Sequence, residues 1–261
     1  AAIDPRGVVA SQDGFIVSDG DRDALLQVNR AGEVVGLAGV SGNGQKELLY
    51  ALSGEDMRAA AGAIRIAGTD AGALHPGARR KLGLHFVPEE RLGRGAVPTL
   101  GLAHNLLLTR QEAISHPRWG GGWIRVQELE QQAAGIIARF NVKAGGPRAL
   151  ARSLSGGNLQ KFIVGREIDA APKLFIVSQP TWGVDVGAAA RIHAEILALR
   201  DAGCAVLLVS EELDELFALS DRMVVMARGR LSPVLPRGQA TVETIGAWMS
   251  GLWTSANHTP S

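Results

Sequence analysis

The chain has 261 residues, of which 46% are hydrophobic and 20% charged, as expected for a globular protein with a substantial core. Its formal net charge of +1 is too small to indicate a nucleic-acid partner. The single cysteine, Cys204, excludes an internal disulfide and fits a reducing compartment. No apolar run reaches the ~20 residues that cross a bilayer, and the first residues, AAIDPRG, lack the features of a signal peptide. A membrane role would therefore require a partner.

The first third of the chain alternates between strand-like runs and turns. A continuous apolar run, Val34–Val40, ends in a glycine-rich loop and is followed at once by the helix-like sequence ELLYAL. Other β-prone runs precede and follow this unit, and Pro88 ends the last of them. We expect these further strands at Phe15–Val17, Ala24–Val28, Gly62–Gly68 and Leu82–Pro88.

The middle of the chain has a different pattern. From about Thr99 to Leu150, leucine, isoleucine and alanine recur at three- and four-residue steps, which indicates amphipathic helices. Glycine breaks this pattern at Gly120–Gly122 and Gly145–Pro147. We therefore expect a mostly helical insert over about 99–150.

Strand-like runs return after the insert. Leu174–Val177 and Ala205–Val209 are continuous apolar runs separated by a helical segment, Ala188–Arg200, as in buried parallel strands joined by a crossover. The sequence thus predicts an α/β fold with a mainly parallel sheet, an antiparallel β portion at the N-terminus and the helical insert. The last expected elements are a hairpin of Met223–Met226 with Leu231–Leu235, a helix at Glu243–Met249, and a loose polar tail at 255–261.

The loop GVSGNGQK, Gly39–Lys46, is the first candidate site. Its glycines place free backbone N–H groups at a helix N-terminus, where the helix dipole favours an anion. Phosphate-binding loops place Lys and then Ser or Thr after the last glycine, to hold the outer phosphates and magnesium. Here those two positions are Gln45 and Lys46, so the backbone cradle carries altered side chains. We expect nucleotide contacts from Gly39, Ser41, Gly42, Asn43, Gly44, Gln45, Lys46 and Glu47.

A second glycine turn, within SLSGGNLQK, also opens a helix. Two glycine amides and the Ser155 hydroxyl would face one way at that helix N-terminus, which makes a second anion site. The simpler alternative is that Ser155 only caps the helix and that Gly156 and Gly157 only form the turn. If both turns bind nucleotide at different edges, a nucleotide would be sandwiched between two such domains.

Four segments in order resemble the nucleotide-binding domain of ABC transporters: GVSGNGQKE, LSGGNLQK, LFIVSQPTWGVD and VLLVSEELDEL. VPEERLGRGA and DRMVVMARGRL are similar to the C-terminal ATPase half of tandem importers of sugars and nucleosides. The resemblance covers roughly Gly36 to Gly251. It implies a P-loop NTPase fold of the ABC ATPase type, in one domain over 1–254 with its core at 1–98 and 151–254.

The same resemblance implies ligands and partners. ATP or ADP would be the ligand, and the partners would be a second ABC ATPase domain and transmembrane permease subunits. The protein would then lie peripherally on the cytoplasmic face of the membrane. Because the chain starts at Ala1 rather than at a methionine, we expect a fragment, and an N-terminal ATPase half could precede it.

Carrying the family roles over position by position reveals several replacements. Gln45 stands for the lysine of the outer phosphates, and Lys46 for the hydroxyl that binds magnesium. The Walker B aspartate, the catalytic carboxylate, the Q-loop glutamine and the switch histidine are replaced, in that order, by Ser178, Gln179, Glu89 and Glu211. The signature and the D-loop aspartate match the family at Ser155, Gly156, Gly157, Gln160 and Asp185.

These replacements would weaken phosphoryl transfer, which depends on positioned charge and an oriented water. Loss of one preorganised electrostatic donor typically costs ~3–4 kcal/mol of barrier, and Gln179 cannot accept a proton from water. The resemblance therefore implies a half that binds ATP weakly or without efficient turnover and lends its signature to a partner's site. We expect magnesium to add little to binding and no further metal site.

Two other functions stay open. In a fully active ABC ATPase, Lys46 and a carboxylate such as Glu47 or Glu211 would replace the missing groups. A non-transport ABC protein acting in translation or repair is disfavoured by the near-neutral charge. Arg91 and Arg94 lie where the family contacts its transmembrane partner, although a solvated basic loop would give the same pattern.

Overall fold

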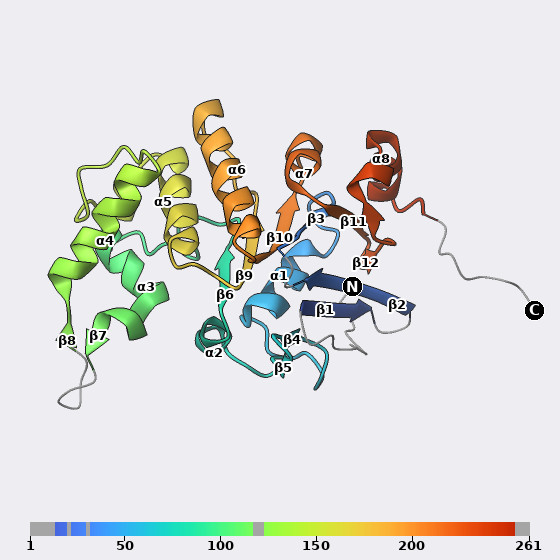
Figure 1. The fold of residues 1–261 in the computed structure, drawn as a ribbon, viewed down its shortest axis with the longest axis horizontal. Coiled ribbons are helices and arrows are strands. Elements are labelled where there is room, and N and C mark those ends of the chain that lie inside the picture. The colour runs from blue at the N-terminus through green and yellow to red at the C-terminus, as the bar shows by residue number, and fades with distance from the viewer. Residues whose placement is uncertain (1–13, 20–21, 30–31, 117–122, 254–261) are drawn as a thin grey trace, which may run out of the picture. The chain divides into compact units, whose positions relative to one another are not determined.

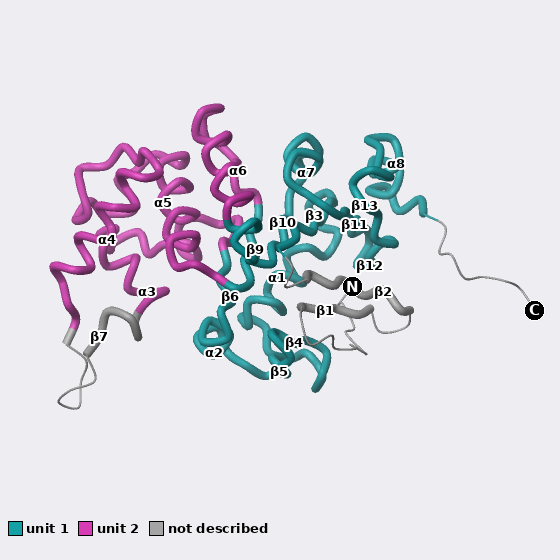
Figure 2. The backbone as a smooth tube through the Cα atoms, in the orientation of Figure 1, with its two compact units in different colours: residues 1–86, 173–178, 199–261 teal, residues 87–172, 179–198 magenta. Residues whose placement is uncertain are grey.

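The computed structural model describes residues 14–19, 22–29, 32–116 and 123–253 (Figure 1). The chain divides into two compact units (Figure 2). Unit 1 consists of residues 1–86, 173–178 and 199–261, and unit 2 of residues 87–172 and 179–198. The predicted α/β fold, with a mainly parallel sheet and flanking helices, is confirmed.

Unit 1 is built on a sheet whose strand order is β12-β11-β3-β10-β9-β6. In its centre β3 (Val34–Ala38) pairs in parallel with β10 (Ala205–Ser210) on one side and β11 (Arg222–Ala227) on the other. The strand β9 (Leu174–Ser178) pairs in parallel with β10, and β6 (Leu84–Val87) is next to β9. All residues of β3, β9 and β10 are buried, which explains why their sequences are continuous apolar runs.

The predicted antiparallel portion is a second sheet with strand order β2-β1-β4-β5. Its strands are β1 (Gly14–Asp19), β2 (Arg22–Asn29), β4 (Arg65–Ile66) and β5 (Thr69–Asp70). The expectation of a single strand over Gly62–Gly68 is wrong. Ala67 and Gly68 have φ values of 48° and 77°, which form a two-residue hairpin turn and reverse the chain after Ile66.

The C-terminal hairpin is confirmed in part. The strand β11 pairs in antiparallel fashion with β12 (Arg230–Leu231) and with β13 (Leu235–Pro236). The expected strand Leu231–Leu235 is therefore two short strands. The interruption lies at Ser232–Pro233, where the proline has no N–H to donate and the Ser232 hydroxyl accepts a hydrogen bond from Val225 N at 2.9 Å.

Helices cover the strands of unit 1. The helix α1 (Gln45–Ser53) buries Leu48, Leu49 and Leu52 in the core. The helix α7 (Leu213–Leu219) contacts β3 and β10, and α8 (Val242–Met249) contacts β11. The remaining helical segments of unit 1 are α2 (Pro76–Lys81) and the 3₁₀ turn Arg237–Gln239.

Unit 2 is mostly helical, with α3 (Leu102–Ile114), α4 (Val126–Arg139) and α5 (Gly156–Ile168). A 3₁₀ turn at Ala151–Ser153 precedes α5. The expected insert also contains a short antiparallel pair that the sequence did not indicate, β7 (Ser115–His116) with β8 (Trp123–Ile124). The helix α6 (Val186–Asp201) matches the expected crossover helix. The glycine break at Gly120–Gly122 and the tail at 255–261 lie outside the described residues.

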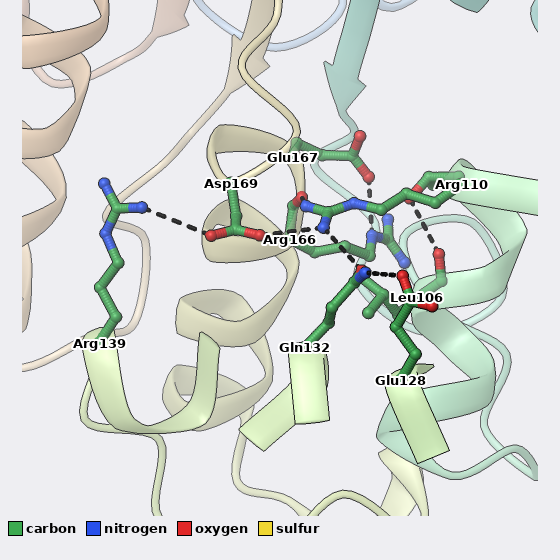
Figure 3. A network of polar contacts seen from close by, with 9 residues as sticks. Leu106, Arg110, Glu128, Gln132, Arg139, Arg166, Glu167 and Asp169 are labelled. Carbon is green, nitrogen blue, oxygen red and sulfur yellow. Dashed lines mark hydrogen bonds and ion pairs between the residues drawn. The ribbon is translucent and has the colours of Figure 1, made fainter. Parts of the chain in front are cut away.

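Charged side chains hold the helices of unit 2 together (Figure 3). Arg166 and Glu167 form a buried ion pair at 2.7 Å, although they are neighbours on α5. From α3, Arg110 donates to the Arg166 carbonyl at 2.7 Å and to the Asp169 carboxylate at 2.9 Å. From α4, Arg139 lies 3.5 Å from the same carboxylate. Asp169 is thus the shared acceptor for cations from two other helices.

Arg79 of α2 is fully buried in unit 1, and its hydrogen-bond acceptors are all carbonyl oxygens. It donates to the carbonyls of Ala51 and Leu52, in the last turn of α1, whose oxygens have no partner within the helix. It also donates to the Leu74 and Gly72 carbonyls. Burial lowers the pKa of the Arg79 guanidinium to about 10, so it stays charged at neutral pH.

Within the described residues, no helix combines the length and the apolar character needed to span a membrane.

We predict that Arg79→Met destabilises unit 1 strongly. The methionine fills the space but leaves buried carbonyls without donors, and each such group costs ~1–3 kcal/mol, so the loss should exceed about 3 kcal/mol. Urea unfolding followed by circular dichroism measures it. Arg58→Met is the control, because the Arg58 side chain is 91% exposed and forms its ion pair with Asp56, two residues away in the chain. Equal stability of the two variants would contradict this role for Arg79.

Candidate functional site

Several predicted site residues of unit 1 meet at the carboxyl edge of its sheet. Ala38, the last residue of β3, pairs with Ser210 of β10, and Val209 pairs with Ser178 of β9. The glycine loop leaves β3 at this edge and Glu211 follows β10. This edge is where open α/β sheets bind their ligands, because loops from neighbouring strands converge there.

The glycine loop has the backbone geometry of an anion cradle. Gly42 and Gly44 have φ values of 87° and 110°, a region that favours glycine. Gly44 is the N-cap of α1 and has no side chain that could cap this helix. The first-turn N–H groups are therefore not taken by a capping side chain. At Gly39, an added Cβ would lie 2.6 Å from the Met226 carbonyl oxygen, so this position requires glycine.

Asn43 fixes the tip of this loop against the turn between β11 and β12. Its Oδ1 accepts a hydrogen bond from Arg228 N at 2.9 Å, and its carbonyl accepts one from Gly229 N at 2.8 Å. The sequence predicted Asn43 as a nucleotide contact, and the structure shows that its side chain amide holds a neighbouring turn. The loop is thereby anchored on a second strand besides β3.

Gln45 is folded back onto the loop. Its Nε2 donates to the Val40 carbonyl at 3.0 Å, and its Oε1 is buried and accepts no hydrogen bond from the described residues. The Lys46 ammonium lies over the Tyr50 ring, 5.7 Å from its centroid, one turn further along α1. The position next to the glycine amides thus holds a neutral amide. Ser41 and Glu47, also predicted here, are exposed.

The donor set suits an anion better than a divalent cation. Mg²⁺ takes oxygen ligands, usually one or two carboxylates with waters and phosphates. Lys46 cannot be such a ligand, and Ser178, only 2% exposed, offers a hydroxyl where a carboxylate would bind. Among the described residues, no group of three or more His, Cys, Asp or Glu side chains could hold a metal ion. The residues present fit phosphate groups and do not fit a tightly held magnesium ion.

The second glycine turn, in unit 2, opens α5. Ser155 is the N-cap, and its hydroxyl oxygen accepts from Asn158 N at 3.4 Å and from Asn158 Nδ2 at 2.9 Å. Asn158 Oδ1 in turn accepts from Lys143 N at 2.9 Å. With both acceptor lone pairs engaged, the Ser155 hydroxyl hydrogen points away from these donors. Ser155 therefore caps the helix, as the simpler alternative expects, and its exposed hydroxyl can also donate a hydrogen bond.

The role of Asn158 was missed from the sequence. Its signal is its position three residues after a cap serine, where a side chain returns toward the cap. Of the other predicted residues of unit 2, Gln160 lies on α5, and Glu89 and Gln179 lie in loops that follow strands. Gln160 is buried, Glu89 is exposed in the turn after β6, and Gln179 has a left-handed backbone with φ 49°. Strain of this kind in a non-glycine residue costs ~1–3 kcal/mol and needs support from its surroundings.

Asp185 caps α6. Its Oδ1 accepts a hydrogen bond from Ala188 N at 2.9 Å, and this bond is the main reason that the pKa of Asp185 is lowered. The carboxylate is exposed, so it remains accessible beside its capping role. The structure thus groups the predicted residues into two sets. Unit 1 carries the glycine loop, Ser178 and Glu211, and unit 2 carries Glu89, the signature residues, Gln179 and Asp185.

The comparisons with a family model and with curated proteins agree on one family. Residues 24–182 match the family model described as "ABC transporter". The chain is 38% identical over 255 residues to the guanosine import ATP-binding protein NupO of Bacillus subtilis (strain 168), covering 96% of this chain and 49% of that protein. It is 41% identical over 217 residues to the ribose import ATP-binding protein RbsA of Chelativorans sp. (strain BNC1), covering 83% and 42%. The chain thus spans about half the length of the curated relatives it matches.

Solved structures share the fold. An ATP-binding subunit of an ABC transporter aligns with a TM-score of 0.72 at 20% identity, over 91% of this chain and 99% of that one. The ATP-binding cassette MJ0796, described as a dimer in a post-hydrolysis state bound to ADP and Pi, aligns with a TM-score of 0.66 at 18% identity, over 86% and 97%.

The two signature glycines should differ in their tolerance of alanine. A Cβ at Gly157 would lie 2.6 Å from the Gly183 carbonyl oxygen, which is backbone, whereas at Gly156 it would lie 2.6 Å from Arg91 Nη1, the end of a flexible side chain. Overpacking against backbone costs ~1–3 kcal/mol, so Gly157→Ala should lower the thermal midpoint by roughly 4 °C or more. Gly156→Ala serves as the matched variant and should lower it less. Equal midpoints would contradict the crowding at Gly157.

Proposed function

Because this chain belongs to the family of ABC transporter ATP-binding domains, we propose that it is the nucleotide-binding half of an ABC importer for a sugar or a nucleoside. Relatives named as guanosine, nucleoside and ribose import proteins support this substrate class. The chain covers 49% and 42% of two of them, which supports a tandem arrangement with a second ATPase half. The permease subunits would hold it at the cytoplasmic face of the membrane.

In this proposal the chain's own loop binds ATP or ADP through backbone amides but turns it over poorly. The observation that carries this point is the neutral Gln45 amide, bonded to the Val40 carbonyl, at the position where the family has a phosphate-binding lysine. Ser178 and Gln179 stand where the family has the two carboxylates of magnesium binding and water activation. Because phosphoryl transfer depends on positioned charge, these neutral groups leave the barrier high.

The signature turn would act in trans. Ser155 offers an exposed hydroxyl and α5 offers its N-terminus, so together they can receive the outer phosphate of a nucleotide held by a partner domain. Asn158 would keep that hydroxyl aimed as a donor, since it occupies the oxygen's acceptor positions. The chain would thus contribute to one hydrolysis site while carrying a second, weak one.

If the chain has a weak site of its own and completes its partner's site, the isolated chain and the assembled transporter should differ in ATPase activity. The isolated chain should release phosphate far more slowly than the transporter. In the transporter, Ser155→Ala should lower ATPase activity roughly 100-fold, the usual cost of losing one preorganised donor. Ser153→Ala is the matched control, because the Ser153 hydroxyl already donates to the Leu150 carbonyl at 2.7 Å. Turnover by the isolated chain at the transporter's rate would show instead an active ATPase.

Magnesium should add little to nucleotide binding by this chain. Calorimetric titration with ATP, once with Mg²⁺ and once with EDTA, should give affinities within about tenfold, or ~1.4 kcal/mol. The reason is that the magnesium-ligand positions carry Lys46 and Ser178, which fit the ion poorly. A gain of more than about 100-fold with Mg²⁺ would mean that another oxygen group in the chain binds the ion.

A further inference from the structure

Arg91 lies in unit 2, and its guanidinium makes contacts within the chain. Neither of the two roles considered above for Arg91, a contact with a transmembrane partner or a place in a solvated basic loop, predicts these contacts. Its Nε donates to Gln160 Oε1 at 3.0 Å, and its Nη2 donates to the Trp182 carbonyl. The guanidinium carbon lies 4.9 Å from the centroid of the Trp182 ring, so the same group also makes a cation–π contact. Burial lowers the pKa of the Arg91 guanidinium.

Gln160 extends this set of contacts. Its side chain is 1% exposed, and its Nε2 donates to the carbonyls of Gln179 and Pro180, each at 3.1 Å. With Oε1 accepting from Arg91, the buried amide has partners on both sides. The left-handed Gln179 is therefore held by a side chain from α5, which itself is held by Arg91.

Arg91 also borders the signature turn. A Cβ at Gly156 would lie 2.6 Å from Arg91 Nη1, and one at Gly183 would lie 3.2 Å from Nη2. Both glycines thus leave room for the guanidinium. The backbone of Arg91 is fixed in its own turn, since its carbonyl accepts from Ala96 N at 2.7 Å. One planar group therefore joins its own turn to α5 and to the loop after Gln179.

We propose that Arg91 is a positioning residue that holds the signature turn Ser155–Gly157 and the loop Gln179–Asp185 in one fixed arrangement, by way of Gln160 and Trp182. The inference rests on the proposed function, because it makes the trans-acting signature depend on Arg91. A planar, five-donor guanidinium can serve the side-chain amide and the carbonyl together, whereas a lysine ammonium cannot match that geometry. Arg91→Lys should therefore behave like Arg91→Met.

Hydrogen–deuterium exchange of the isolated full chain tests the arrangement. Arg91→Met should raise the exchange of amides in 155–158 and 179–184 at least tenfold, and leave the glycine loop 39–46 unchanged. The matched control is Arg94→Met, in the same segment, whose ion pair is with Glu90 at 3.9 Å; it should leave the two segments protected. Unchanged exchange in the Arg91 variant, or a rise in only one of the two segments, would overturn the inference.

The assembled transporter tests the consequence. Arg91→Met should lower kcat for ATP hydrolysis about tenfold and leave KM within about twofold, because the signature would be misplaced while nucleotide binding is kept. Arg58→Met, at an exposed side chain that pairs with Asp56 outside this arrangement, should stay near wild-type. If Ser155→Ala lowers kcat and Arg91→Met does not, the Arg91 inference fails alone. If Ser155→Ala has no effect, the proposed function fails, and the inference that rests on it fails with it.

Discussion

The parallel pairing of β3 with β10 and β11 is the constraint on which the rest of unit 1 depends. It places the glycine loop, Ser178 and Glu211 at one sheet edge, since Ala38 pairs with Ser210 and Val209 with Ser178. Each of these strands is fully buried or nearly so, and moving one by a residue would turn its buried side chains to the other face. The core strands therefore decide where the loop, Ser178 and Glu211 meet.

The two glycine turns show how similar backbones can differ in chemistry. At α1 the cap is Gly44, which has no side chain to satisfy the first-turn amides, so these amides suit an external anion. At α5 the cap is Ser155, whose oxygen already accepts from Asn158 and whose hydrogen is left to donate. The first turn offers only backbone donors beside a neutral glutamine, and the second offers a hydroxyl held by a neighbouring amide.

Much of the fold could be predicted from the sequence, because it depends on patterns that are local. Continuous apolar runs marked β9 and β10, and glycine followed by a helical run marked the loop before α1. The predicted strands were wrong where one or two residues decide the path of the chain. The turn at Ala67 and Gly68 splits one expected strand, and Pro233 interrupts another. The contacts of Arg91 with Gln160 and of Asn158 with Lys143 could not be predicted, because these partners lie far away in the chain.

If this chain binds nucleotide but turns it over poorly, as proposed, the difference between backbone and side-chain contributions explains how binding outlasts catalysis. The cradle is made of glycine conformations and a helix terminus, and it is held between the buried strand β3 and the helix α1. Hydrolysis adds a requirement for charge at chosen points, and each lost donor costs ~3–4 kcal/mol of barrier. Under the proposed function, replacing Gln45 alone should restore little, because Ser178 and Gln179 would still be neutral and Lys46 offers no oxygen to magnesium. The same packing that preserves the cradle thus leaves these side chains free to change without loss of the fold.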